Sequence, residues 1–114
     1  MKKNKKKSNL FWIYILKCDN GNYYTGYTRD LTRRFQQHLE GKVKYTRSFR
    51  PICIAQSWQL LDEIGVALKI ERFVKKQDKK TKELFIQHPD RLKEMVSKKL
   101  QIYTELDSRT PLSK

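Results

Sequence analysis

The stretch FWIYILKCDNGNYYTGYTRDLTRRFQQH, residues 11–38, decides the fold because it joins two strand patterns, a turn signal and a helix start. Residues 11–17 and 22–28 are rich in aromatic and β-branched side chains, and Asp-Asn-Gly at 19–21 separates them. Alternating runs of this kind around a short glycine-containing loop predict a β-hairpin.

The loop length decides which tyrosines of the hairpin share a face, because a shift of one residue moves every side chain to the other side. A two-residue turn would place Tyr14 and Tyr24 on opposite faces. A three-residue loop, with Gly21 in the left-handed conformation, would instead pair Tyr14 with Gly26. Only this second register brings both phenols to one face.

A helix is predicted to follow the hairpin, with Asp30 as its N-cap and Gly41 at its end. Arg34 and His38 are four residues apart and therefore form one stripe of this helix at the edge of the core. Three apolar residues at the same spacing form the neighbouring stripe, which we expect to be buried: Leu31, Phe35 and Leu39.

The remainder of the chain predicts one more strand and three more helices. Residues 42–51 form a basic connector without a regular pattern, and residues 52–61 read as a third strand. A helix follows from about residue 62 to 77, with an inner side that we expect to consist of Ala67, Ile70 and Val74. Shorter helices are expected at 81–86 and 89–100, and residues 107–114 are expected to be a frayed end.

This reading gives a small α/β (α+β) domain, in which a three-stranded antiparallel sheet is flanked by helices. At 114 residues the chain has room for one compact core. We expect a flexible basic arm at residues 1–9, a single domain at 10–103 and a C-terminal tail at 104–114.

The charge of the chain indicates a polyanionic partner. Lysine and arginine number 26 against 12 acidic residues, giving a formal net charge of +14. No long apolar span or strongly amphipathic basic helix favours a membrane, so nucleic acid is the expected partner. The N-terminal segment lacks a cleavage site of the secretory type, which favours a cytoplasmic protein.

The cysteines and histidines do not have the spacing of a structural zinc site. Cys18 and Cys53 are far apart, as are His38 and His88, and no CxxC pair is present. Both cysteines fall in strand-like runs, where we expect small buried thiols.

The sequence contains four separate short motifs in this order along the chain: WIY at 12–14, YTG at 24–26, RDLTRRFQQH at 29–38 and ALKIERF at 67–73. Together they resemble the GIY-YIG nuclease family, and in particular its small stand-alone bacterial members. Trp12 stands where the first motif has glycine, and a threonine stands in the middle of the second. The resemblance implies a small three-stranded α/β fold and hydrolysis of phosphodiester bonds in DNA with one divalent ion, Mg²⁺ or Mn²⁺.

The resemblance also implies the site: Tyr14 and Tyr24 as the motif tyrosines, Arg34 as the catalytic arginine, His38 as the helix histidine and Glu71 as the metal ligand. The guanidinium of Arg34 matches the oxygens of a phosphate, and the carboxylate of Glu71 suits a hard cation. A phenol is a poor base at neutral pH unless a cation stabilises its phenolate, whereas a histidine titrates nearer neutrality. The general base therefore stays open among the two tyrosines and the histidine.

Ordinary structural explanations exist for the same residues. The tyrosines could pack in a half-buried strand, Arg33 and Arg34 could form a solvated face, and Glu71 could pair with Lys75 four residues later.

Binding of nucleic acid is expected to rest on phosphate contacts and to depend steeply on salt. Six basic residues are the candidates for these contacts: Lys42, Lys44, Arg47, Arg50, Lys75 and Lys76. The leading hypothesis is a structure-directed DNA endonuclease acting on branched, flapped or nicked DNA in repair or recombination. The alternatives are a non-catalytic nucleic-acid-binding module on the same scaffold and a protein directed to RNA.

Overall fold

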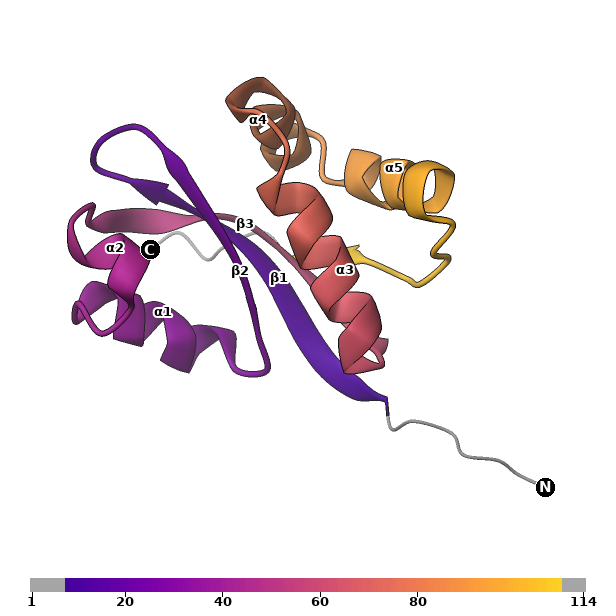
Figure 1. The fold of residues 1–114 in the computed structure, drawn as a ribbon, viewed down its shortest axis with the longest axis horizontal. Helices are drawn as coiled ribbons and strands as arrows, with labels where there is room; N and C mark the ends of the chain where they lie inside the picture. The colour runs from indigo at the N-terminus through magenta and orange to yellow at the C-terminus, as the bar shows by residue number, and fades with distance from the viewer. Residues whose placement is uncertain (1–7, 110–114) are drawn as a thin grey trace.

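The computed structural model describes residues 8–109, which form four strands and five helices (Figure 1). The first half of the chain supplies β1 (Asn9–Cys18), β2 (Tyr23–Thr28), α1 (Leu31–Leu39) and α2 (Lys44–Arg47). The second half supplies β3 (Pro51–Asp62), α3 (Ile64–Lys75), α4 (Lys79–Gln87), α5 (Asp90–Leu100) and β4 (Asp107–Ser108). Most of the predicted arm and the last five residues lie outside the described part of the chain.

The four strands form one antiparallel sheet in the order β2-β1-β3-β4, so the prediction of three strands is corrected to four. The hairpin between β1 and β2 has the register of the three-residue loop, with Tyr14 opposite Gly26 and Leu16 opposite Tyr24. Gly21 adopts the left-handed conformation, with φ of 84°, and its N–H donates to the carbonyl of Cys18 at 3.0 Å. Both motif tyrosines therefore lie on one face of the hairpin.

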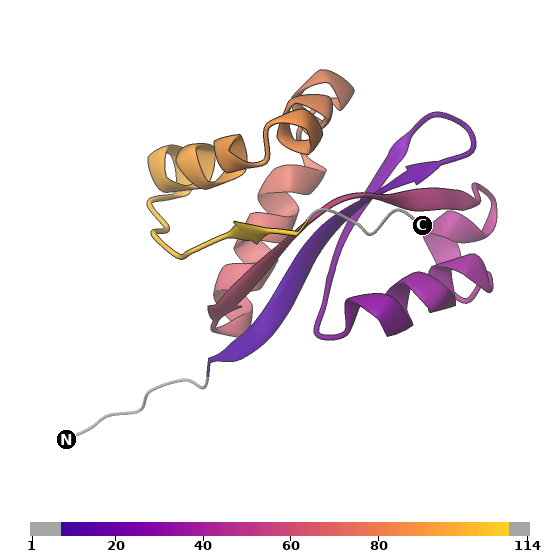
Figure 2. The same cartoon turned by 180° about the vertical axis from the view of Figure 1, so that it is seen from behind.

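The helices cover opposite sides of the sheet. Figures 1 and 2 show α1 and α2 on one side, and α3, α4 and α5 on the other. The apolar core lies mainly under α3, where the predicted inner residues Ala67, Ile70 and Val74 are all buried. It also contains side chains from β1, β3, α4 and α5: Phe11, Ile13, Ile15, Trp58, Leu60, Phe85, Leu92 and Val96.

Helix α1 begins as predicted but buries a different residue. The carboxylate of Asp30 accepts a hydrogen bond from the N–H of Arg33 at 3.1 Å and caps the helix. The expected buried stripe is wrong, because Leu39 is 39% exposed and Leu31 and Phe35 are only half-buried. The buried residue of α1 is His38, with 1% of its surface exposed.

The C-terminal segment also differs from the prediction, because residues 107 and 108 form β4 instead of a frayed end. Strand β4 pairs with Trp58 and Gln59 of β3, and Leu106 just before it is buried in the core. Helix α5 ends at Gln101, whose left-handed φ of 57° turns the chain back toward the sheet.

The structure also differs from two smaller predictions. The connector that showed no regular pattern contains the one-turn helix α2. Cys18 is buried as expected, whereas Cys53 is exposed.

Candidate active site

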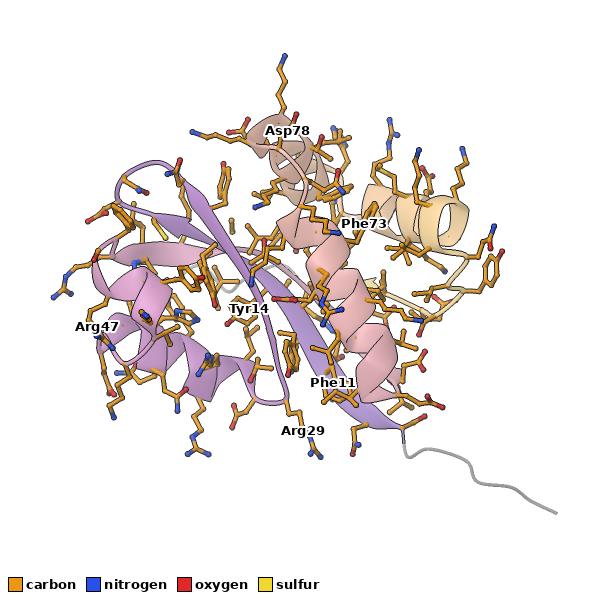
Figure 3. All side chains as sticks on the ribbon, viewed as in Figure 1. Phe11, Tyr14, Arg29, Arg47, Phe73 and Asp78 are labelled. Atoms are coloured by element: carbon orange, nitrogen blue, oxygen red, sulfur yellow. The ribbon has the colours of Figure 1, made fainter. Side chains whose placement is uncertain are left out.

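The side chain of Tyr14, which is labelled near the centre of Figure 3, is buried. Hydrogen bonds link it to α1 and, through His38, to α2. Its hydroxyl lies 2.9 Å from Nε2 of His38. The other ring nitrogen of His38, Nδ1, lies 2.8 Å from the hydroxyl oxygen of Thr46 in α2. Because His38 and Thr46 are both buried, the bond between them is shielded from water.

Gly26 of β2 makes room for the Tyr14 hydroxyl. A Cβ atom at this position would lie 2.5 Å from the Tyr14 oxygen and 2.7 Å from Cζ, well inside van der Waals contact. The close approach explains why the second motif ends in glycine, because any side chain there would displace the phenol.

Tyr24 is half-buried and lies against the same histidine, so His38 contacts both tyrosines. The ring centroids of Tyr24 and His38 are 5.0 Å apart in an edge-on arrangement. Tyr45 of α2 lies 6.3 Å from Tyr24 and is 73% exposed, and the ammonium of Lys75 lies 5.8 Å from the Tyr24 ring. The second phenol therefore stands at the surface of the site, between α2 and α3.

Arg34 lies beside the buried chain and is oriented by its own helix. Its Nη1 donates to the side-chain carbonyl of Gln37 at 2.9 Å. The guanidinium lies close enough to Tyr14 and His38 to affect the pKa of both. Arg34 is half-buried, whereas the neighbouring Arg33 is exposed.

Burial dominates the electrostatics of this cluster. It raises the pKa of Tyr14 to about 12, against the opposing effect of the Arg34 guanidinium, while the charge of Glu71 contributes to the increase. Burial also lowers the pKa of His38 to about 4, and Arg34 lowers it further because a positive neighbour disfavours the imidazolium. At neutral pH both the phenol and the imidazole are therefore uncharged.

Glu71 of α3 is buried and pairs with Lys75 at 3.3 Å, one turn later. Because the ammonium of Lys75 also lies 5.8 Å from the centre of the Tyr24 ring, the carboxylate lies near Tyr24. Within residues 8–109, no group of three or more histidine, cysteine or acidic residues forms a cage for a metal. A single carboxylate still fits Mg²⁺ or Mn²⁺ if water and substrate oxygens complete the shell, with Lys75 giving up its bond to Glu71.

A groove of about 430 Å³ lies beside the cluster, between the end of β2 and α1. Its lining contains three arginines, Arg29, Arg33 and Arg34, together with Gln37 and residues at the end of β2. Arg34 belongs to both the groove and the tyrosine cluster, so it joins the two. The sequence interpretation included neither Arg29 nor Gln37, because isolated polar residues before and within a helix do not predict a groove.

The six predicted phosphate-binding residues lie on the surface in two groups. Lys42, Lys44, Arg47 and Arg50 surround α2, where Lys42 pairs with Glu40 at 3.0 Å and Nε of Arg47 donates to the carbonyl of Gly41 at 3.1 Å. Lys75 and Lys76 lie at the end of α3, on the other side of Tyr24. Positive charge therefore flanks the half-buried phenol of Tyr24 from both helices.

The fold and this cluster define a GIY-YIG type of domain. A family model described as the GIY-YIG catalytic domain matches residues 10–84, and the chain belongs to this family. The family consists of endonucleases, which supports a nuclease type of function.

The chain is similar to small bacterial proteins of the UPF0213 group. It is 39% identical over 93 residues to a UPF0213 protein of Bacillus velezensis, covering 79% of this chain and 91% of the relative. It is 37% identical to the UPF0213 protein YazA of Bacillus subtilis, with the same coverage of both chains. The solution NMR structure of the UPF0213 protein BH0048 from Bacillus halodurans has 33% identity and a TM-score of 0.42, covering 77% of this chain and 97% of that one.

Within residues 8–109, no helix has the length and apolar character needed to cross a membrane.

Proposed function

We propose that the protein is a divalent-metal-dependent endonuclease that hydrolyses phosphodiester bonds in DNA. One observation carries the proposal: the ring of His38 lies against both Tyr14 and Tyr24, and the ion pair of Lys75 with Glu71 lies beside Tyr24. Together with Arg34 one turn before His38, a phosphate-binding cation and a carboxylate lie close to two phenols that share one imidazole. Tyrosines that served only to pack the sheet would not need these charged neighbours.

Arg34 binds the scissile phosphate in this proposal. The negative charge on the non-bridging oxygens of a phosphodiester grows as a fifth oxygen approaches phosphorus, and a fixed guanidinium stabilises that charge. The hydrogen bond that Arg34 donates to Gln37, together with the partial burial of Arg34, holds the planar group in place before the substrate arrives. Preorganisation of this kind lowers the cost of orienting the charge during the reaction.

Glu71 would hold the divalent cation. Such an ion, when bound, would neutralise the phosphate and stabilise the leaving oxygen. The ammonium of Lys75 pairs with Glu71 and lies beside Tyr24, where it would bind a neighbouring phosphate.

Tyr14 and His38 act together as the proton acceptor. A phenol with a pKa of about 12 is too weak an acid to be ionised at neutral pH, so Tyr14 alone does not supply a phenolate. Nε2 of His38 at 2.9 Å offers a destination for the phenol proton as Tyr14 receives one from the attacking water. Tyr24, which is partly exposed, orients the water or the sugar-phosphate chain at the surface.

The substrate lies across the arginine groove and the basic surface around α2 and α3. Phosphate contacts of this kind carry no sequence information, so binding is independent of sequence and steeply dependent on salt. The exposed ring of Tyr45 between these charges suits an unstacked base, which supports branched, flapped or nicked DNA as the substrate and a role in repair or recombination.

The proposal is tested by comparing Glu71→Gln with Glu94→Gln, a matched change at an exposed residue of α5. Cleavage of linear, nicked, flapped and four-way DNA is measured with Mg²⁺ and with Mn²⁺, and binding is measured in parallel. We expect Glu71→Gln to lose cutting and to retain salt-sensitive binding, whereas Glu94→Gln keeps both. Intact substrates with the unchanged protein under all conditions would instead support a non-catalytic binding module, and preferential binding or cutting of RNA would support an RNA-directed protein.

A further inference from the structure

We propose that Thr46 is a positioning residue, whose hydroxyl holds His38 in the tautomer with its proton on Nδ1 and thereby leaves Nε2 free to accept the proton of Tyr14. Thr46 is a residue of α2, the one-turn helix that the sequence pattern does not predict. Its catalytic consequence rests on the proposed nuclease function, whereas the tautomer itself does not.

The direction of the hydrogen bonds follows from counting donors and acceptors along the buried chain. Arg34 has only donors, and it lies beside the Tyr14 hydroxyl. If the Tyr14 hydroxyl donates to Nε2 of His38, then Nδ1 carries the ring proton and donates to the oxygen of Thr46. The Thr46 hydroxyl in turn donates to the carbonyl of Val43 at 3.4 Å. Every hydrogen in this arrangement has an acceptor.

The opposite direction leaves a hydrogen without a partner. If Nε2 carried the ring proton, the oxygen of Tyr14 would face two donors, His38 and Arg34. The hydrogen of the Tyr14 hydroxyl would then have no acceptor among the contacts described for residues 8–109. An unsatisfied buried hydroxyl costs on the order of 1–3 kcal/mol, so the first arrangement is favoured.

The local backbone explains how Thr46 reaches this position. Gly41 adopts a left-handed φ of 76° after α1 and allows the chain to reverse. Val43 precedes α2, and its carbonyl accepts from the N–H of Thr46 at 3.2 Å as well as from the hydroxyl. These two hydrogen bonds to Val43 fix the position of Thr46, and its hydroxyl oxygen lies 2.8 Å from Nδ1 of His38.

This geometry gives His38 a defined role in the proton step. As the oxygen of water bonds to phosphorus, the water proton moves to the oxygen of Tyr14 and the Tyr14 proton moves to Nε2. The P–O bond opposite the attacking water breaks, and the leaving oxygen takes up a proton from solvent. The His38 imidazolium then returns its proton through Tyr14 to solvent, which restores the starting state.

The neighbours of His38 keep its imidazole neutral before the reaction. Tyr14 from β1, Tyr24 from β2, Arg34 from its own helix and Thr46 from α2 face the ring. No carboxylate is among these neighbours, and Arg34 is positive. An unprotonated Nε2 is therefore present across the neutral range.

The tautomer is tested directly by ¹⁵N NMR of the histidine rings, in which couplings to the ring C–H protons distinguish a protonated from a bare nitrogen. In the unchanged protein we expect the proton of His38 on Nδ1. Thr46→Ser, which retains the hydroxyl, should give the same pattern, and Thr46→Val, which removes it, should shift the proton toward Nε2. His38 with its proton on Nε2 in the unchanged protein, or an unchanged pattern in Thr46→Val, would overturn the proposal.

Single-turnover cleavage then tests the catalytic consequence. Hydrogen-bond partners that orient a metal-bound histidine contribute about 10- to 100-fold. We expect a factor of the same size for His38, so Thr46→Val should cut more slowly by this factor with unchanged DNA binding. Thr46→Ser should restore the rate to within about threefold. Equal rates for Thr46→Val and the unchanged protein would overturn the positioning role, whereas absence of cutting by the unchanged protein would refute the proposed function and leave the NMR result to decide the tautomer.

Discussion

Acidification should destabilise this protein through one buried imidazole, His38. The pKa of this side chain is about 4 in the folded protein and about 6.5 when it is exposed to water. The unfolded chain therefore binds more protons than the folded one between these values, and stability rises with pH there. The contribution of His38 is fully present above about pH 6.5 and is lost as the pH falls toward 4.

The magnitude follows from the difference between the two pKa values. Each pKa unit corresponds to about 1.4 kcal/mol, so the complete loss is about 3 kcal/mol at strongly acidic pH. Between about pH 7.5 and pH 5, the same linkage gives a loss of about 2 kcal/mol. For a domain of this size, that is a large fraction of the free energy of unfolding.

The assay is urea unfolding at a series of pH values, with the free energy of unfolding obtained by linear extrapolation. His38→Gln should remove this part of the pH dependence, whereas His88→Gln changes an exposed histidine and should leave it in place. Carboxylates titrate in all three proteins, so their effects cancel in the comparison. The reasoning is refuted if the curves of His38→Gln and the unchanged protein run parallel from pH 7.5 to 5.

Three further changes test other parts of the structure. Gly26→Ala should destabilise the fold by about 1–3 kcal/mol, measured by urea unfolding, because the new methyl group overlaps the Tyr14 hydroxyl. Leu106→Ala should cost about 2–5 kcal/mol in the same assay, since this residue is 7% exposed, whereas the 65% exposed Leu61→Ala should stay within about 0.5 kcal/mol; equal effects would contradict a core position for Leu106. Arg33→Ala should weaken DNA binding for all sequences and reduce the salt slope by about 1, and an unchanged slope would remove the groove from the binding surface.

The hairpin and the start of α1 could be predicted because their determinants are local. The Asp-Asn-Gly segment marks the turn and the Asp30 side chain caps the helix, whereas the register stayed open between two loop lengths until the structure showed Gly21 in the left-handed conformation. Turn chemistry and capping depend on a few adjacent residues, so they can be read without knowledge of the rest of the chain.

The burial of α1 could not be predicted because it depends on what the helix meets. Periodicity marks Leu39 as a core residue, yet the sheet presents two tyrosines to this helix. His38 is the residue of α1 that is buried because it packs against Tyr14 of β1 and Tyr24 of β2 and lies within hydrogen-bond distance of the hydroxyl of Thr46 in α2. The sequence could not identify the general base for the same reason, because the hydrogen bond between His38 and Thr46 joins two separate helices.

Strand β4 could not be predicted from local sequence patterns for a different reason. A strand of two residues carries no alternation, and its position depends on Gln101 turning the chain back after α5. Leu106 becomes a core residue only because this turn returns it to the sheet. Composition alone cannot distinguish such a segment from a frayed end.

The most direct test of the central claim is the single-turnover rate of Mg²⁺-dependent DNA cleavage by Arg34→Lys, compared with Arg33→Lys. The two changes are adjacent and conserve charge, but only Arg34 lies beside Tyr14 and His38. Loss of the planar donor group at the scissile phosphate should lower the rate by about 100-fold or more in Arg34→Lys and by less than about threefold in Arg33→Lys. Equal rates for the two variants would contradict an active site built around Arg34.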